Sequence, residues 1–156
     1  MSRRRLALAA AALGAAGAAA GLWLGLSGGS GGQSREGYLA RVSAVCRTDA
    51  RRLERVPAPS DPAAYGDVAA AVRGAVPLLE HQVAAMEALE PPAGLGPRLE
   101  RLFALDRASI AALGRTLAAA LRRDAGGVAT GLVRFGRLRD RVHALAVSIG
   151  IDCAPS

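Results

Sequence analysis

Apolar residues recur at every third or fourth position through most of the chain after residue 34, and this spacing constrains the fold more than any other feature. Such a period is typical of amphipathic helices, because it places these side chains on one helix face. Proline-rich stretches and a Gly-Gly pair divide the pattern into segments, which predict helices at about 35–56, 60–90, 97–122 and 128–149. No stretch alternates polar and apolar residues long enough to indicate a strand. The expected fold is therefore all-α, an up-down-up-down four-helix bundle with short loops.

Local signals indicate how two of these helices begin and end. Ser60 or Asp61 is expected to cap the second helix, with Pro62 in its first turn, where proline lacks only an N–H that would be unpaired anyway. Gly150 is expected to end the fourth helix in a left-handed conformation, with Ile151 folding back onto the bundle.

An uninterrupted apolar run, Leu6–Leu26, follows three consecutive arginines near the N-terminus. A run of this length can cross a bilayer as a transmembrane helix, and the basic flank holds its N-terminal end in the cytoplasm. Two fates stay open, an uncleaved signal anchor and a signal peptide removed after export. The sequence thus predicts a signal anchor or signal peptide at 1–26, a flexible Gly/Ser linker at 27–34 and an extracytoplasmic helical bundle at 35–156. The expected location is the cell membrane, with the domain outside, or the secreted fraction after cleavage.

Three glycines in the apolar run, Gly17, Gly21 and Gly25, recur every four residues. Small residues at this spacing let transmembrane helices approach closely, which predicts a weak homodimer through the membrane segment. The Gly-rich composition of the segment produces the same spacing without any dimer, and both interpretations stay open.

The charge of the chain is positive, yet it gives little support for a nucleic-acid partner. The formal net charge is +7, and three of the 20 basic residues lie in the N-terminal arginine triplet. The remaining 17 arginines face 13 acidic residues, so the domain from Arg35 onward carries only +4. Nucleic-acid binding requires basic residues gathered on one face, often with aromatic residues for stacking, and this domain has few aromatics. We therefore expect no nucleic-acid partner.

The chain has two cysteines, Cys46 on the apolar stripe of the first helix and Cys153 just after the fourth. An exported domain meets an oxidising environment, in which such a pair is expected to form a disulfide. In an up-down-up-down bundle the first and fourth helices are antiparallel, so the tail after Ile149 has to climb only about two turns to reach Cys46. A free thiol nucleophile and an intermolecular bridge are the alternatives.

Three short motifs carry a resemblance to a known group of proteins. They are a Tyr eight residues before a helical Cys (Tyr38 and Cys46), a Leu-Glu-Pro-Pro turn at Leu89–Pro92 and a closing Ile-Gly-Ile-Asp-Cys at Ile149–Cys153. Over about residues 36–154 the chain resembles uncharacterised exported or membrane-anchored four-helix proteins of high-GC Gram-positive bacteria. The resemblance implies the same export, bundle and disulfide, and it implies no activity.

Two acids, Asp49 and Asp106, fall on the apolar stripes of their helices and are candidates for buried carboxylates. They lie within about 6 Å of the same level of the bundle if each residue rises about 1.5 Å. One interpretation is a proton or cation site. The other is that each acid pairs with an arginine of a neighbouring helix, for example Arg73 or Arg139, as buried charges commonly do.

No catalytic, cofactor-binding or metal-binding residue is assigned from the sequence. A di-iron site of the ferritin type needs Glu-x-x-His pairs on two helices, and the chain offers only Asp140-x-x-His143 as a poor equivalent. His81 and His143 do not align with the apolar stripes, so both are expected on the surface.

The sequence predicts a membrane-tethered, non-enzymatic bundle with an interaction or envelope-associated role and an unknown protein or envelope partner. One alternative is a metal- or cation-binding bundle. Another is a binder of anionic lipid or envelope polymer. Its contact residues would be two arginine rows, Arg47, Arg51 and Arg55 on the first helix and Arg134, Arg137 and Arg141 on the fourth.

Overall fold

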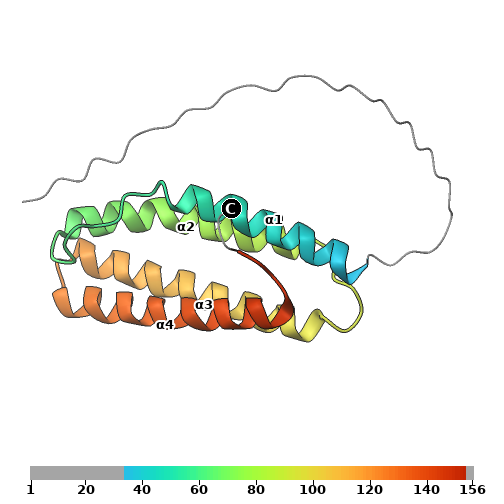
Figure 1. The fold of residues 1–156 in the computed structure, drawn as a ribbon. Helices are drawn as coiled ribbons and strands as arrows, with labels where there is room; N and C mark the ends of the chain where they lie inside the picture. Colours follow the sequence, from blue (N-terminus) through green and yellow to red (C-terminus); the bar gives the residue numbers. More distant parts are fainter. Residues whose placement is uncertain (1–33, 154–156) are drawn as a thin grey trace, which may run out of the picture. The chain divides into compact units, whose positions relative to one another are not determined.

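The computed structural model describes residues 34–153. The predicted leader at 1–26, with its glycine motif, and the linker up to residue 33 lie outside this range. Within it the chain is all-α and contains no strand, which confirms the predicted fold class. The four helices (Figure 1) are α1 Arg35–Leu53, α2 Tyr65–Glu87, α3 Gly96–Leu121 and α4 Ala125–Ile149. None of these helices has the length and apolar character required to span a membrane.

The helix ends follow from local chemistry, with one correction to the sequence prediction. Ser34 caps α1 by accepting a hydrogen bond from the N–H of Gly37 at 3.1 Å, and Asp124 caps α4 in the same way through Gly127 at 2.9 Å. The prediction that Ser60 or Asp61 caps α2 is wrong. The Asp61 carboxylate instead accepts from the N–H of Ala63 at 2.8 Å, which forms a separate turn before the helix.

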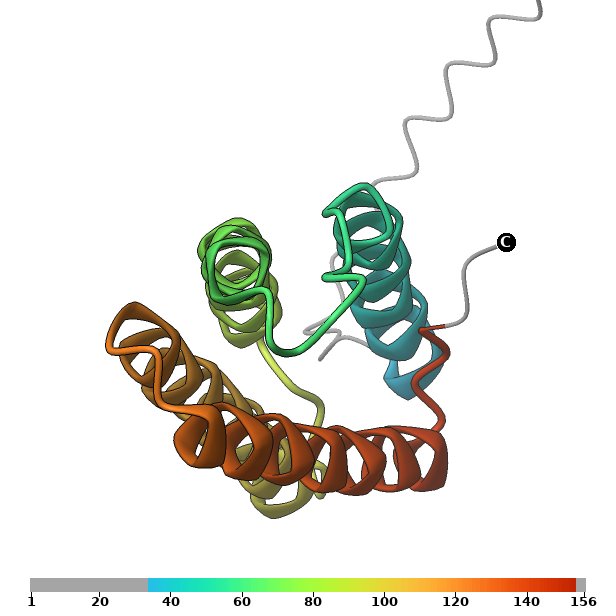
Figure 2. The same ribbon diagram turned by 90° about the vertical axis from the view of Figure 1, so that its left-hand side faces the viewer.

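Consecutive helices run in opposite directions, so the chain passes back and forth along the domain (Figure 1). Each helix packs against the next in sequence, α1 on α2, α2 on α3 and α3 on α4. The first and last helices do not pack closely on each other, because no Cα atom of α1 lies within 8 Å of one of α4. Figure 2 views the domain from the end where α2 starts. In this view α1 and α4 approach each other only at the far end.

Two apolar clusters form the interior, one toward each end. The first joins all four helices and contains Tyr38 and Val42 of α1 with Leu99 of α3 and Ile149 of α4. The second is built from α2, α3 and α4, and Leu53 is the only residue of α1 packed against it. The cause is the length of α1, which ends at Leu53 and cannot cover the other helices along their whole length. The two ends of the domain are therefore closed differently.

The chain leaves α4 through a left-handed glycine, as the sequence predicts. Gly150 has φ 98°, a conformation that glycine adopts without steric cost. The N–H of Ile151 then donates to the carbonyl of Ala146 at 2.9 Å, and its side chain is buried. This reversal directs the C-terminal residues back toward α1.

Candidate functional site

The C-terminal tail is fastened to one face of α1. The Sγ atoms of Cys46 and Cys153 lie 1.96 Å apart and their Cα atoms 5.0 Å apart, which is a disulfide. The hydroxyl of Ser43 accepts a hydrogen bond from the N–H of Asp152 at 3.0 Å, and Arg47 lies 3.7 Å from the Asp152 carboxylate. Because Ser43, Cys46 and Arg47 are spaced three and four apart, they share one helix face. The tail is thus held by a covalent bond and by polar contacts of Asp152.

A further contact joins α1 and α4 at the same end of the domain. The guanidinium of Arg35 donates a hydrogen bond to the carbonyl of Ile149 at 3.5 Å, where the carbonyl groups of a helix end need partners. The two helices that do not approach along their length are therefore joined at this end.

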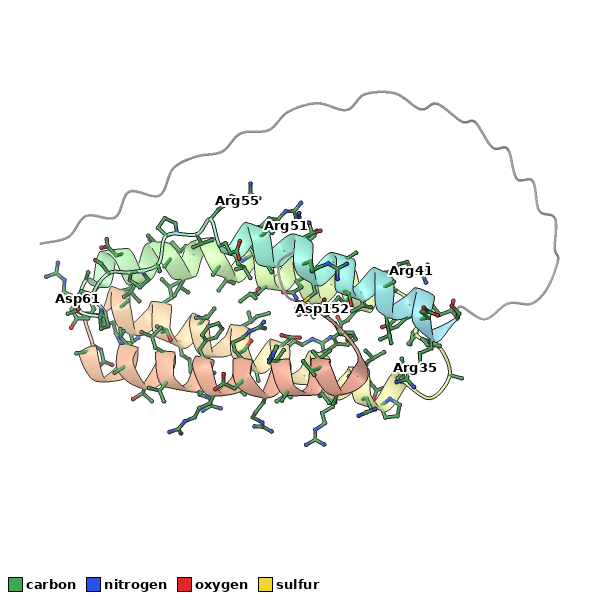
Figure 3. All side chains as sticks on the ribbon, in the orientation of Figure 1. Arg35, Arg41, Arg51, Arg55, Asp61 and Asp152 are labelled. Atoms are coloured by element: carbon green, nitrogen blue, oxygen red, sulfur yellow. A yellow bond between two sulfur atoms is a disulfide. The ribbon has the colours of Figure 1, made fainter. Side chains whose placement is uncertain are left out.

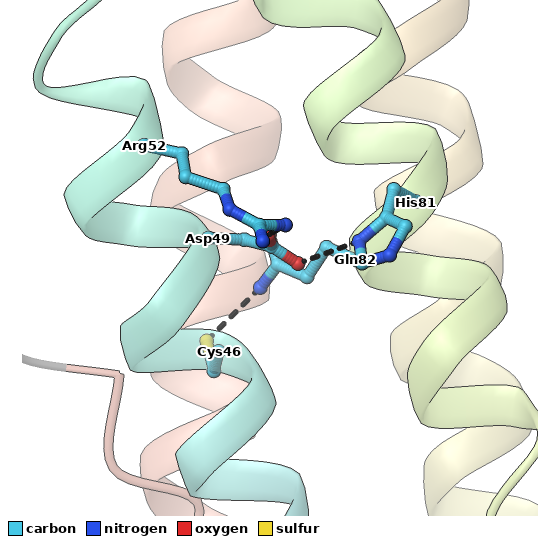
Figure 4. A network of polar contacts seen from close by, with 5 residues as sticks. All are labelled: Cys46, Asp49, Arg52, His81 and Gln82. Atoms are coloured by element: carbon cyan, nitrogen blue, oxygen red, sulfur yellow. Dashed lines mark hydrogen bonds and ion pairs between the residues drawn. The ribbon is translucent and has the colours of Figure 1, made fainter.

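A polar network lies between α1 and α2, next to the disulfide (Figure 4). The Asp49 side chain is 1 % exposed and accepts a hydrogen bond from Arg52 at 2.9 Å. Its other oxygen lies 3.1 Å from Nδ1 of His81, whose side chain is 60 % exposed. Gln82 donates to the sulfur of Cys46 at 3.0 Å. The burial of Asp49 is therefore compensated by charge and by hydrogen bonds.

The Asp49–His81 contact fixes the orientation of an imidazole, as carboxylates often do in proteins. Nδ1 carries the proton of this contact if the carboxylate is ionised, because an ionised carboxylate can only accept. Among the described residues, however, no hydroxyl or thiol forms a hydrogen bond with the ring. Residues 34–153 also contain no group of three or more His, Cys, Asp or Glu side chains arranged to hold a metal ion.

Asp106 lies on α3 and pairs with Arg139 of α4. Nη1 of Arg139 donates to the Asp106 carboxylate at 2.7 Å, and the Asp106 side chain is 6 % exposed. Burial raises the pKa of Asp106 above its ordinary value, while the charge of Arg139 and its hydrogen bond oppose this rise. Burial and the contact with Arg139 thus act on the pKa of the same carboxyl in opposite directions.

The two candidate acids are buried, but the structure gives them separate partners. Arg139, one of the two arginines suggested from the sequence, contacts Asp106, whereas Arg73 contacts neither acid. Asp49 pairs instead with Arg52 of its own helix. Sequence reasoning expected His81 on the surface, which holds for most of its ring, and missed its contact with Asp49. Only the packing of α1 on α2 brings them together, so no spacing within one helix could indicate it.

The two predicted arginine rows differ in their surroundings. Arg47 contacts Asp152. Arg51 of α1 extends into solvent, and so does Arg55, which lies just after the end of α1 at Leu53 and not on the helix as predicted (Figure 3). The row on α4 lies along an open surface hollow, and a neighbouring hollow adds two arginines of α3. None of these five has an acidic partner within residues 34–153. They are Arg115, Arg122, Arg134, Arg137 and Arg141.

An apolar pocket of about 320 Å³ opens where α1 has ended. All four helices and the connection after α1 contribute side chains to it, including Leu53, Pro57, Leu79 and Phe135. Arg139 is the only polar side chain among the described residues that line it. Its volume falls at the lower end of the roughly 300–1,000 Å³ found for small-molecule sites.

No protein-family model, curated protein or solved structure matches this chain.

Proposed function

We propose that this chain is an extracytoplasmic helical module, held at the membrane by its N-terminal apolar run, that acts by interaction and not by catalysis. The observation that carries this proposal is the Cys46–Cys153 disulfide, which joins residues 107 positions apart. Disulfides persist in oxidising compartments and are rare in the cytosol. The bridge therefore supports export, the direction that the arginine-flanked leader also favours.

The position of the first helix supports a tether. α1 begins at Arg35, directly after the Gly- and Ser-rich residues that follow the apolar run. Gly/Ser-rich linkers generally leave the parts that they join free in orientation, which supports the proposal of a tether at this point of the sequence. The interaction role is supported by the arginines that line the two surface hollows, since they have no acidic partner among residues 34–153 and their charges can therefore meet a partner.

The location is tested with the full chain produced in a bacterial host. In intact spheroplasts we expect external protease to digest the domain, and thiol alkylation without reductant to leave Cys46 and Cys153 unmodified. A variant with both cysteines changed to Ser controls for the effect of folding on protease access. Mass spectrometry of the N-terminus shows whether the leader is kept as an anchor or removed as a signal peptide. Protection from protease together with free thiols would refute the proposal.

A second candidate function is binding of an anionic lipid surface through the arginines of α3 and α4. Val133, which lines the same hollow as Arg134 and Arg137, is 55 % exposed, so apolar and basic groups lie together on this face. Amphipathic basic faces of this kind bind anionic membranes.

Co-sedimentation with phosphatidylglycerol vesicles tests this second function. We expect binding that is lost with neutral vesicles and weakened by salt, because screening reduces such attraction. A triple change of Arg134, Arg137 and Arg141 to Gln should abolish binding, whereas a change of Arg51 on α1 and of Arg55 just after it to Gln should preserve it. Equal binding by both variants would contradict a role for this face.

A further inference from the structure

We propose that the apolar pocket at the open end of the domain binds a single-chain carboxylic acid, with its hydrocarbon chain among the helices and its carboxylate on Arg139. The pocket holds about 320 Å³ and is lined almost entirely by aliphatic and aromatic side chains. Apolar clefts of this size with one or two positioned polar groups are typical of small-molecule sites. The site is separate from the surface arginines and from the Asp49 network.

The chemistry of Arg139 selects the polar end of the ligand. A guanidinium has five N–H donors and no acceptor, so a ligand group that meets it must be an acceptor. One of these donors is used by Asp106. The Arg139 side chain lines the pocket and is 32 % exposed as a whole. A carboxylate matches the planar fork of the guanidinium in charge and in geometry.

Asp106 is the positioning residue for this contact. Its carboxylate accepts a 2.7 Å hydrogen bond from Nη1, which orients the guanidinium between α3 and α4. A carboxylate as buried as that of Asp106 is costly to keep in a core, since apolar residues of similar volume often stabilise a protein as well or better. A charged pair at the edge of an otherwise apolar pocket is therefore explained by recognition of a ligand.

The wall of the pocket on the α1 side is built by the connection between α1 and α2. Val56, Pro57 and Pro59 line the pocket, and the two prolines fix the backbone of this short segment. Val56 is seated against α2, where a Cβ atom added to Gly74 would lie 3.1 Å from its Cγ1. The connection between α1 and α2 is thus fixed in place, and the cleft that it borders is open to the hydrocarbon chain of a ligand.

The test uses the full chain in isolated membranes and a medium-chain fatty acid that carries a photoreactive diazirine on its hydrocarbon chain. After irradiation, labelled peptides are mapped by mass spectrometry. We expect labels on the α2 and α4 segments that contain Ala75 and Leu132. An excess of unlabelled dodecanoic acid should remove this labelling, and dodecanol should compete at least about ten-fold less well, as one charge-assisted contact predicts.

Matched variants connect the labelling to the pocket and to Arg139. Ala75→Phe fills the pocket and should abolish the labelling, whereas Ala70→Phe, on the exposed face of the same helix, should preserve it. Replacing Asp106 by Asn and Arg139 by Gln together removes both charges without leaving either unpaired. This double variant should bind the acid and the alcohol about equally.

Several outcomes would overturn the proposal. Labels confined to the N-terminal apolar run would show that the acid meets only the membrane segment. Equal competition by acid and alcohol in the wild-type chain would remove the role of Arg139, and this comparison does not depend on any variant folding. Equal loss of labelling in Ala75→Phe and Ala70→Phe, with both variants retaining wild-type helicity, would place the acid elsewhere.

Discussion

At the scale of single residues, the domain contains two buried carboxylates that are stabilised differently. Asp49 receives a charged hydrogen bond from Arg52 and contacts His81, so both of its oxygens have partners. Asp106 has Arg139, and burial still raises its pKa. The apolar stripes of the sequence indicated both acids, because a charged residue in a core-facing position is an exception. The sequence pattern did not indicate that Arg52 and His81 are the partners of Asp49.

The raised pKa of Asp106 predicts how its contribution to stability depends on pH. The folded protein binds this proton at pH values where the unfolded chain has lost it, so the contribution falls as pH rises from about 4 through the folded pKa. We expect the free energy of unfolding of the wild type minus that of Asp106→Asn to be largest at acid pH and to decline toward neutrality. Urea unfolding across this range measures the difference.

Glu80→Gln on the exposed face of α2 is the matched control for this measurement, because it removes one negative charge without changing the interior. A wild-type advantage over Asp106→Asn that grew with pH would contradict the assignment, since it would mean that folding favours the ionised form of Asp106.

At the scale of the helices, α3 and α4 pack so closely at one point that only a glycine, which has no Cβ atom, fits there. A Cβ atom added to Gly131 of α4 would collide with the buried Thr116 of α3, whereas one added to Gly136 would meet nothing within 4 Å. Thr116 cannot easily move, because its hydroxyl donates to the carbonyl of Ala112 at 2.9 Å. Both glycines carry the same helix propensity in the sequence, and only the packing distinguishes them.

Two alanine substitutions in α4 should therefore have opposite effects. Gly136→Ala should raise the free energy of unfolding by about 0.5–1 kcal/mol through helix propensity alone. Gly131→Ala gains the same propensity but overpacks the contact with Thr116, at a cost of about 1–3 kcal/mol, so the net effect is destabilising. Urea or thermal unfolding measures both. Equal stabilisation by the two substitutions would show that α3 and α4 are farther apart than described.

At the scale of the whole domain, the two ends are closed by different means. The end that contains Tyr38 and Ile149 has an apolar cluster drawn from all four helices, and the tail is bonded to α1 there. At the other end α1 has stopped at Leu53, and a proline-containing connection beside an apolar pocket continues in its place. The disulfide thus joins the tail after α4 to α1, two helices that have no Cα atoms within 8 Å of each other.

Removal of the bridge should cost much of the stability of the domain. Cys46 and Cys153 are 107 residues apart, and closing a loop of this length contributes about 4–5 kcal/mol by the chain-entropy estimate. We expect the double change of both cysteines to Ser to lower the urea midpoint strongly, and reduction of the wild type to reproduce this. A loss below about 1 kcal/mol would mean that the tail contacts hold α1 without the bridge.

The sequence by itself determined the all-α class, the approximate helix bounds, the left-handed end at Gly150 and the burial of Asp49 and Asp106. These properties follow from periodicity and local backbone chemistry, which a single segment expresses without reference to the others. Only the tertiary structure decided that His81 meets Asp49, that Gly131 is the point of close approach, and that the early end of α1 leaves a pocket beside Arg139. Such features depend on distances between helices, and one-dimensional spacing does not encode how far apart two packed helices lie.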